Sequence, residues 1–430
     1  MKKIKANPGD YVELSLIKRS YKGILLESPK SEKDIILIKL NTGYNIGFKK
    51  KDVLGIKILK RIDKKVEEIE VKKDTKKPDI AMILTGGTIA SKYDPETGAV
   101  SPLTKSEELF KYYPEIFQIA NVTKIEIPFM KASEDMDYKD WQKIAKSVER
   151  LINDPNIKGV IITHGTDTLH YTSAALSFFF QNLNKPVVLT YSQRSIDRAS
   201  SDANLNLQCA ALAAISDIAE VILVGHATIE DNFCYAMPGT KVRKFHSSRR
   251  DAFKVVNGKP IAKIYPNRIE IFSDYNIRSN RIVKADTRFE EKVALVKIYP
   301  GQDPDILDYY LKKKYRGVVL EVFGLGHVPT QDVRNRWINK IKEVQKKGMI
   351  VCAAAQTIYG RLNPMVYSNG RKLLEAGVIF LEDMLSETAL IKLGYILGHK
   401  EWAKSKEIVK EKMLKNFVGE ISDRLENLCN

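Results

Sequence analysis

Two short threonine-containing segments carry side chains that could perform nucleophilic chemistry. The sequence TGGT at residues 85–88 places two hydroxyl groups around two glycines, and THGTDT at residues 163–168 adds a histidine and a carboxylate. A threonine hydroxyl is a poor nucleophile at its ordinary pKa and needs an adjacent base. Because adjacent glycines permit a mobile turn, the hydroxyl of Thr88 could swing over a bound substrate.

The base could be a lysine held near Thr166 and Asp167, which would supply a hydroxyl relay and a carboxylate. A lysine in a dry pocket can lose its proton and act as a base. The basic stretch PGTKVR at residues 238–243 offers Lys241 as the candidate. The sequence alone leaves open whether Lys241 reaches the site.

Each motif also has a structural interpretation when it is taken alone. TGGT could be a tight turn after a strand, which is a common use of glycine. A phosphate-binding loop is disfavoured, because the G-x-G-x-x-G and G-x-x-x-x-G-K-[ST] patterns are absent. HGTDT could begin a helix that is capped by Thr166 or Asp167. We expect His164 to orient this turn, since no carboxylate is spaced to form a serine-type triad with it.

The elements that must position these residues alternate between strand and helix. From Asp79 onward the pattern predicts helices such as 137–152 and 168–181 between apolar strands at residues 80–84, 122–127, 158–163, 186–190 and 220–225. This rhythm is typical of a doubly wound α/β fold with a mostly parallel sheet. Ligands bind at the carboxyl ends of the strands in such sheets, which is where TGGT, THGTDT and MKASEDM (130–136) would lie.

The remaining regions predict two smaller units. Residues 1–60 contain short β-rich runs that suggest a small antiparallel barrel, and the charged residues 61–78 predict a linker or an exposed helix. A second strand–helix series predicts a smaller α/β domain, with strands at 293–298, 316–322 and 349–353 and helices at 303–313 and 331–346. The predicted organisation is a basic β domain (1–60), a linker (61–78), a large α/β domain (79–285) and a C-terminal α/β domain (293–430).

The charge of the chain is strongly basic and unevenly distributed. The formal net charge is +17, and residues 1–77 contain 19 Lys and 2 Arg against 11 acidic residues, a net charge of +10. A basic surface attracts polyanions such as RNA, although solvated surface lysines explain the excess equally well. A second basic cluster comprises Lys241, Arg243, Lys244, Arg249, Arg250 and Lys254.

Cysteine usage and hydropathy point to a reduced, non-membrane environment. The four cysteines (Cys209, Cys234, Cys352 and Cys429) show no paired spacing, which favours reduced thiols in a cytoplasmic protein over disulfides or a zinc site. The longest apolar runs are far too short to span a bilayer. We therefore expect no membrane partner.

Taken together, TGGTIA at 85–90, SEDM at 133–136 and THGTDT at 163–168 resemble the motifs of bacterial-type L-asparaginase/glutaminase amidohydrolases. The resemblance covers about residues 79–400 and implies a two-domain α/β fold. It implies that Thr88 is the nucleophile and that Thr166, Lys241 and Asp167 form the second catalytic group. It also implies that Ser133 and Glu134 bind the α-carboxylate and α-amino groups of the substrate, and that Asp167 contacts the α-amino group as well.

Three further stretches, 192–207, 356–379 and 382–398, together with the extra β domain, resemble the D subunits of archaeal glutamyl-tRNA(Gln) amidotransferases. In that family the D subunit releases ammonia from glutamine, and no cofactor or metal is expected in this chain. A GatE-type partner subunit uses ATP and magnesium to phosphorylate Glu-tRNA(Gln) and receives the ammonia. The resemblance implies a homodimer of this chain within a heterotetramer. The loop tyrosine of the family would correspond to Tyr93.

Two other functions compete with this interpretation. One is a free-standing L-asparaginase whose extra domain adds stability. The other is a non-catalytic RNA-binding adaptor, which the charge of residues 1–77 suggests but which leaves the threonine motifs without a role. A cysteine-dependent glutaminase is disfavoured, because no cysteine lies in a G-x-C-x-G elbow.

Overall fold

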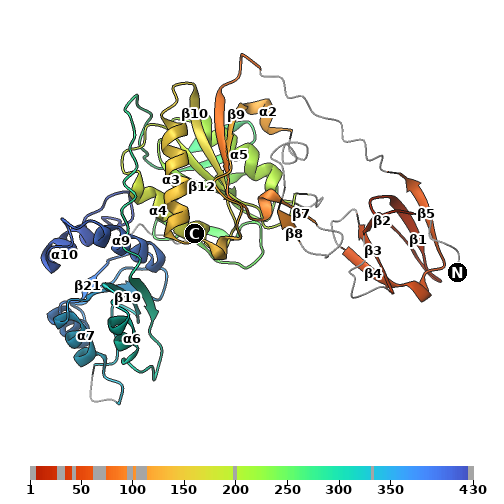
Figure 1. Cartoon of the computed structure of the whole chain (residues 1–430). Helices are drawn as coiled ribbons and strands as arrows, with labels where there is room; N and C mark the ends of the chain where they lie inside the picture. Colours follow the sequence, from red (N-terminus) through yellow and green to blue (C-terminus); the bar gives the residue numbers. More distant parts are fainter. Residues whose placement is uncertain are drawn as a thin grey trace.

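The computed structural model shows three main sheets that follow one another along the chain (Figure 1). It describes residues 6–26, 34–40, 45–61, 74–93, 100–102, 114–196, 201–330 and 334–424. Most of the predicted linker, residues 62–73, lies outside this part of the chain, so the expectation of a linker or helix there stays a prediction.

The first sheet is antiparallel and is built from the N-terminal residues. Its strands, in the order β4-β3-β2-β1-β5, are β1 (Tyr11–Ser15), β2 (Ser20–Leu26), β3 (Ile35–Leu40), β4 (Asn45–Lys49) and β5 (Gly55–Lys60), with the short turn η1 (Lys50–Asp52) before the last. Alternate residues such as Val12, Leu14 and Leu25 point into a small core of their own. The predicted small N-terminal domain of antiparallel strands is confirmed, whereas closure of this sheet into a barrel stays a prediction.

The second sheet has eight strands and is parallel over most of its width. Its order is β17-β16-β13-β12-β11-β10-β6-β9, and its strands are β6 (Asp79–Leu84), β9 (Asn121–Glu126), β10 (Ile157–Thr163), β11 (Val187–Thr190), β12 (Val221–His226), β13 (Cys234–Pro238), β16 (Ala262–Tyr265) and β17 (Arg268–Ile271). Strands β9 to β12 pair in parallel, and β13, β16 and β17 extend the sheet as antiparallel strands. The five predicted strands all lie in the parallel part.

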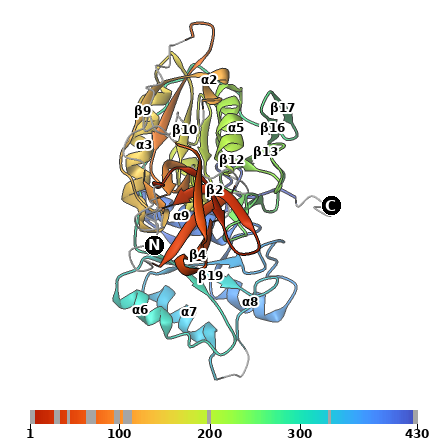
Figure 2. The same cartoon turned by 90° about the vertical axis from the view of Figure 1, so that its right-hand side faces the viewer.

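Helices cover both faces of this sheet, as Figure 2 shows for α3 (Tyr138–Ile152) and α5 (Ala203–Ile215). Alternation along β6 explains the layers: Ala81 and Ile83 join the core under α3 and α4 (Leu169–Phe179), whereas Ile80 and Met82 join the core under α5. The short α2 (Ile116–Ile119) packs on the α5 side. Asp137 closes a capping box with Asp140 at the start of α3, which fixes the beginning of that helix.

The third sheet is parallel, in the order β18-β19-β20-β21, and forms the small domain at the lower left of Figure 1. Its elements are β18 (Val293–Lys297), α6 (Ile306–Lys312), β19 (Gly317–Val322), α7 (Trp337–Lys346), β20 (Ile350–Ala355), α8 (Ser368–Glu375), β21 (Ile379–Phe380), α9 (Ser386–Gly398) and α10 (Lys406–Leu414). Helix α9 packs against α4, so that Leu393 and Phe178 share one hydrophobic core across the two domains. The predicted α/β fold of two units with mostly parallel sheets is confirmed.

Short elements connect the strand ends. Two hairpins pair β7 (Ser91–Tyr93) with β8 (Val100–Pro102) and β14 (Val242–Lys244) with β15 (Phe253–Val255). Two 3₁₀ turns, η2 (Thr88–Ala90) and η3 (Ser133–Asp135), follow β6 and β9. Within the described ranges, no helix combines the length and the apolar character that crossing a bilayer requires.

Candidate active site

Three turns at the carboxyl ends of neighbouring parallel strands are joined by hydrogen bonds. Thr85, after β6, donates both its backbone N–H (3.3 Å) and its hydroxyl (2.8 Å) to the carbonyl of Thr163 at the end of β10. The backbone N–H of Lys131, after β9, donates to the carbonyl of Thr85 at 3.0 Å. The TGGT, MKASEDM and THGTDT segments therefore meet at one edge of the sheet, as the sequence predicts.

The two glycines of TGGT allow the first turn to lie directly on the other two. Gly86 and Gly87 have φ angles of +115° and +80°, which L side chains rarely adopt. A Cβ atom on Gly86 would collide with the backbone of Lys131, and one on Gly87 would collide with the backbone of Gly165. The glycine contact brings together the segments that carry Thr88 and Thr166, each of which directly follows one of the touching glycines.

Two hydrogen bonds to the carbonyl of Gly87 fix the turn that carries Thr88. The carbonyl of Gly87 accepts hydrogen bonds from the backbone N–H of Ala90 (3.0 Å) and from the hydroxyl of Ser91 (2.7 Å). Thr88 is half-buried. In the described part of the chain its hydroxyl makes no hydrogen bond, which leaves it accessible to a substrate.

A lysine does contact the second threonine motif, but it is Lys244. The Nζ atom of Lys244 lies 2.7 Å from Oγ1 of Thr166 and 2.8 Å from Oδ1 of Asp167. The Lys244 side chain is 11% exposed, whereas that of Asp167 is 61% exposed and faces the solvent or an incoming ligand. The predicted triad of hydroxyl, amine and carboxylate is therefore present with a different lysine.

The prediction that Lys241 lies beside Thr166 is wrong. The Nζ atom of Lys241 lies 2.6 Å from Oδ2 of Asp383, and both side chains are buried. Burial lowers the pKa of Lys241, while the neighbouring carboxylate of Asp383 acts in the opposite direction. The reason is strand periodicity: Val242 and Lys244 point to one side of β14 and Lys241 to the other, and Val242 is fixed in the core.

The remaining predicted substrate-binding residues lie around the same turns. The hydroxyl of Ser133 accepts a hydrogen bond from the backbone N–H of Asp167 at 3.1 Å, and the carbonyl of Ser133 accepts one from the hydroxyl of Thr168 at 2.6 Å. Gly165 packs so closely on Ser133 that a Cβ atom there would lie 2.8 Å from the serine Oγ. Glu134 is exposed at the surface of the turn. Ser133 and Asp167 are thus coupled through the backbone.

His164 occupies a fully buried position within the THGTDT turn. Its Nδ1 atom lies 2.7 Å from the carbonyl of Gly165, and its Nε2 atom lies 2.9 Å from the hydroxyl of Thr172 on α4. Burial lowers the pKa of His164 to about 4, so the ring is neutral at pH 7. A neutral ring that donates from Nδ1 and accepts at Nε2 links the turn to the helix, in agreement with the orienting role that we expect.

The predicted tyrosine partner stays a prediction. Tyr93 is the last residue of β7, but its side chain lies outside the described part of the structure.

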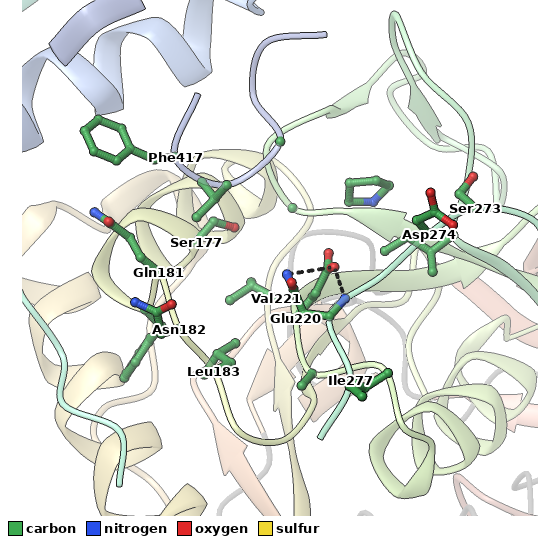
Figure 3. Close-up of a pocket in the computed structure, with 18 of the residues that line it drawn as sticks. Ser177, Gln181, Asn182, Leu183, Glu220, Val221, Ser273, Asp274, Ile277 and Phe417 are labelled. Atoms are coloured by element: carbon green, nitrogen blue, oxygen red, sulfur yellow. Dashed lines mark hydrogen bonds between the residues drawn. The ribbon is translucent and has the colours of Figure 1, made fainter. Parts of the chain in front are cut away.

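One cavity of the structure is remote from these turns. It has a volume of about 490 Å³. Figure 3 shows Glu220, Val221, Leu183 and Phe417 among the residues that line it. Val221 is the first residue of β12, so this cavity lies at the amino-terminal end of the parallel strands, opposite the end where Thr166 lies. Burial raises the pKa of Glu220, which accepts two hydrogen bonds from Asn276. The catalytic hypothesis therefore rests on the loop cluster and not on this cavity.

Lys244 is the site residue that the sequence interpretation missed. A signal was present, because Lys244 belongs to the basic cluster and is two residues from Val242 in a strand of the antiparallel hairpin. Once Val242 is assigned to the core, the alternation of a strand places Lys244 on the same side, facing α4 and its preceding turn.

The chain is similar to known families over nearly its whole length. Residues 79–276 match the family "Asparaginase, N-terminal", residues 292–411 match the "Glutaminase/Asparaginase C-terminal domain", and residues 6–59 match the "GatD N-terminal domain". These matches follow the three sheets of the structure.

Relatives named as the D subunit of glutamyl-tRNA(Gln) amidotransferase match nearly the full length of the chain. The protein of Pyrococcus abyssi is 46% identical, and the match covers 98% of this chain and 96% of that protein. The protein of Methanococcus maripaludis (strain C6) is 40% identical, and the match covers 98% of this chain and 99% of that protein. Among solved structures, the thermostable L-asparaginase from Thermococcus kodakarensis matches with a TM-score of 0.71 and 30% identity, covering 80% of this chain and 100% of that chain. L-asparaginase I from Vibrio cholerae matches with a TM-score of 0.68, also at 30% identity, over 80% and 99%.

Proposed function

Because the chain belongs to the asparaginase/glutaminase family, and within it to the D subunits of glutamyl-tRNA(Gln) amidotransferases, we propose that it is the glutaminase subunit of a tRNA-dependent amidotransferase. It hydrolyses glutamine to glutamate and ammonia. A partner subunit uses the ammonia to convert Glu-tRNA(Gln) to Gln-tRNA(Gln). The observation that carries this proposal is the contact of Lys244 with Thr166 and Asp167. Thr166 directly follows Gly165, on which the turn of Thr88 packs through Gly87.

The reaction begins at Thr88. Its Oγ1 attacks the side-chain amide carbon of glutamine and forms a C–O bond, and the carbonyl electrons move onto the oxygen. Backbone N–H groups at the glycine turn stabilise this oxyanion, and one such donor is typically worth about 3–4 kcal/mol. The tetrahedral intermediate collapses with cleavage of the C–N bond, which leaves an acyl ester on Thr88 and releases ammonia.

Proton transfer is the role of the Lys244–Thr166 pair. The amine of Lys244, acting through the hydroxyl of Thr166, accepts a proton and returns one to the departing nitrogen, a contribution of about 10²–10⁴ in rate. Water then attacks the acyl ester, and glutamate leaves with the original hydroxyl of Thr88 restored. Lys244 thus takes the role that the sequence interpretation gave to Lys241.

Substrate selection falls to the turn after β9. Ser133 and Glu134 bind the α-carboxylate and α-amino groups of glutamine, and the exposed carboxylate of Asp167 adds a second contact to the α-amino group. The hydrogen bond from the Asp167 N–H to the Ser133 hydroxyl supports this arrangement, because it fixes the two residues relative to each other.

The similarity to the D subunits supports a proposal for the partners as well. We propose a GatE-type subunit that binds ATP and magnesium and phosphorylates the γ-carboxylate of Glu-tRNA(Gln), together with a homodimer of this chain in a cytoplasmic heterotetramer. The basic N-terminal residues would contact the tRNA or the partner.

The competing function is a free-standing L-asparaginase, which the match to two asparaginase structures keeps open. The test is to assay ammonia release from glutamine and from asparagine by the chain alone, by the chain with its partner, and by the complex with Glu-tRNA(Gln). Glutaminase activity that appears with the complex is the expected result. Strong asparaginase activity of the isolated chain, unchanged by partner and tRNA, would favour the alternative.

A further inference from the structure

The strand that carries Lys244 is clamped to the small domain by two ion pairs. Lys241, just before β14, contacts Asp383 at 2.6 Å, and Arg243, within β14, contacts Glu387 at 3.0 Å. Both acidic residues lie at the amino-terminal end of α9, at or just before its first turn. The large domain thus presents two cations to two carboxylates of the small domain immediately beside Lys244.

The periodicity of the strand separates the clamp from the site. Lys241 and Arg243 are two residues apart and contact the carboxylates at the start of α9, whereas Val242 lies in the core and Lys244 contacts Thr166 in the turn before α4. Pairing with β15, which places Lys244 opposite Phe253, keeps the strand extended. A shift or rotation of β14 relative to α9 would therefore move the ammonium group of Lys244 away from Thr166.

The small-domain side of the clamp is itself fixed. The second carboxylate oxygen of Asp383 accepts the backbone N–H of Ser422 at 3.0 Å, and its carbonyl accepts a hydrogen bond from Asn257 at 3.0 Å. Ser386 lies beside the other carboxylate: its hydroxyl donates to Glu321 at 2.6 Å and lies 3.2 Å from Glu387. The carboxylates therefore have little freedom to follow a displaced β14.

A third contact joins the same two segments. The hydroxyl of Thr388 on α9 donates to the carbonyl of Thr240 at 2.8 Å, and both residues are buried. Residues 240, 241 and 243 are consequently attached to α9 or to the residues just before it.

We propose that Lys241 and Arg243 are positioning residues that hold Lys244 on Thr166 by anchoring β14 to Asp383 and Glu387. This inference rests on the proposed role of Lys244 in proton transfer. The glutaminase centre then depends on the relative placement of the two α/β domains, because Lys244 lies on β14, the strand that contacts the small domain. A displacement of about 1 Å at a catalytic group can cost on the order of 10²-fold in rate, so a looser clamp lowers kcat without removing any group that touches substrate.

The test compares full-length Arg243→Met and Arg243→Lys with the wild type, each assembled with its partner subunit and tRNA. Arg243 is the more suitable site because its side chain is 25% exposed, whereas Asp383→Asn leaves a buried ammonium unpaired and risks unfolding. We expect Arg243→Met to lower kcat about 10-fold with a KM for glutamine within about twofold of wild type, and Arg243→Lys to restore most of kcat.

The matched control is Asp286→Asn, which loosens the other end of α9. Asp286 accepts from His399, the residue after α9, at 2.9 Å and does not contact residues 240–243. This variant is expected to keep kcat while losing stability. Equal losses of kcat in Arg243→Met and Asp286→Asn would overturn the positioning role.

A double variant separates this inference from the proposed function. In a Lys244→Ala background, Arg243→Met is expected to cause no further loss of the residual rate, because there is no lysine left to position. An independent, additive loss would contradict the inference. Full activity of Lys244→Ala alone would instead refute the proposed role of Lys244 in proton transfer, on which the inference rests.

Discussion

The amine of Lys244 lies 2.7 Å from the hydroxyl of Thr166, although 78 residues separate them in the chain. Three features make this contact: the turn after β10, the hairpin of β14 and β15, and the attachment of that hairpin to α9. The Thr166 hydroxyl and the Lys244 amine lie near the turn of Thr88 because Gly87 packs directly on Gly165, the residue before Thr166. Each of these features can be tested separately by substitution.

The two lysines of the segment 241–244 should respond differently to substitution. We expect Lys244→Met to lower kcat for glutamine by about 10²–10⁴ with little change in melting temperature, because it removes the proton-transfer group. Lys241→Met should lower kcat far less and should destabilise the protein by about 3–5 kcal/mol, because it leaves the buried carboxylate of Asp383 without its cation. Steady-state kinetics and thermal unfolding measured on both variants distinguish them. The reverse assignment would show that Lys241 is the catalytic lysine after all.

Removal of the Thr88 hydroxyl should abolish hydrolysis without abolishing binding. Thr88→Val keeps the shape of the side chain, and we expect it to lower kcat at least about 10³-fold while calorimetry still detects bound glutamine. Thr88→Ser retains a hydroxyl and should keep part of the activity. Ordinary glutamine turnover by the valine variant would exclude Thr88 as the nucleophile.

The contact between Gly87 and Gly165 should make a single methyl group intolerable. Gly87→Ala combines a φ of +80° with a collision against the Gly165 backbone, so we expect loss of glutaminase activity together with a clear fall in melting temperature. Gly301 is the matched control, since its φ is +83° but no atom lies within 4 Å of an added Cβ. Gly301→Ala should show only the conformational cost, about 1–2 kcal/mol, with full activity. Similar losses in both variants would show that backbone strain alone, and not the contact, matters.

The buried ring of His164 should contribute to acid lability. Its pKa is about 4 in the folded protein against about 6.5 in an unfolded chain, so the unfolded state binds the proton more tightly. Its contribution to stability is complete above about pH 6.5 and is lost as the pH falls toward about 4, by at most about 3 kcal/mol. Unfolding free energies measured from pH 7 to pH 4 should fall less steeply for His164→Gln than for the wild type.

The sequence predicted the layers and the loops of the site because their signals are local. The apolar run of β6 ends in TGGT, and the run of β10 ends in THGTDT, so parallel pairing alone places both motifs at one edge. The choice between Lys241 and Lys244 could not be read from proximity in sequence, since both lie in one basic stretch. It depends on which face of β14 meets the core, and that is decided by the packing of Val242 and by the carboxylates of α9, far along the chain.

Other differences have similar physical reasons. The main sheet is parallel only from β9 to β12, because β13, β16 and β17 return as antiparallel strands within the region that the pattern showed as an interruption. Helix α4 begins at Leu169 with Thr168 at its N-cap position, so neither Thr166 nor Asp167 is the cap residue. The reason is that Lys244 and Ser133 contact these turn residues. Where side chains from distant segments bind turn residues, the local sequence pattern does not predict the start of the following helix.

The hydrophobic core shared by Phe178 of α4 and Leu393 of α9 has a consequence for thermal unfolding. If either α/β domain unfolded alone, the apolar side chains of the other domain would be exposed to water. The two domains should therefore unfold as a single cooperative unit in calorimetry. The N-terminal sheet encloses Val12, Leu14 and Ile38 in a separate core and should give its own transition. Excision of residues 1–60 should therefore leave the main endotherm of the remaining chain at its original temperature.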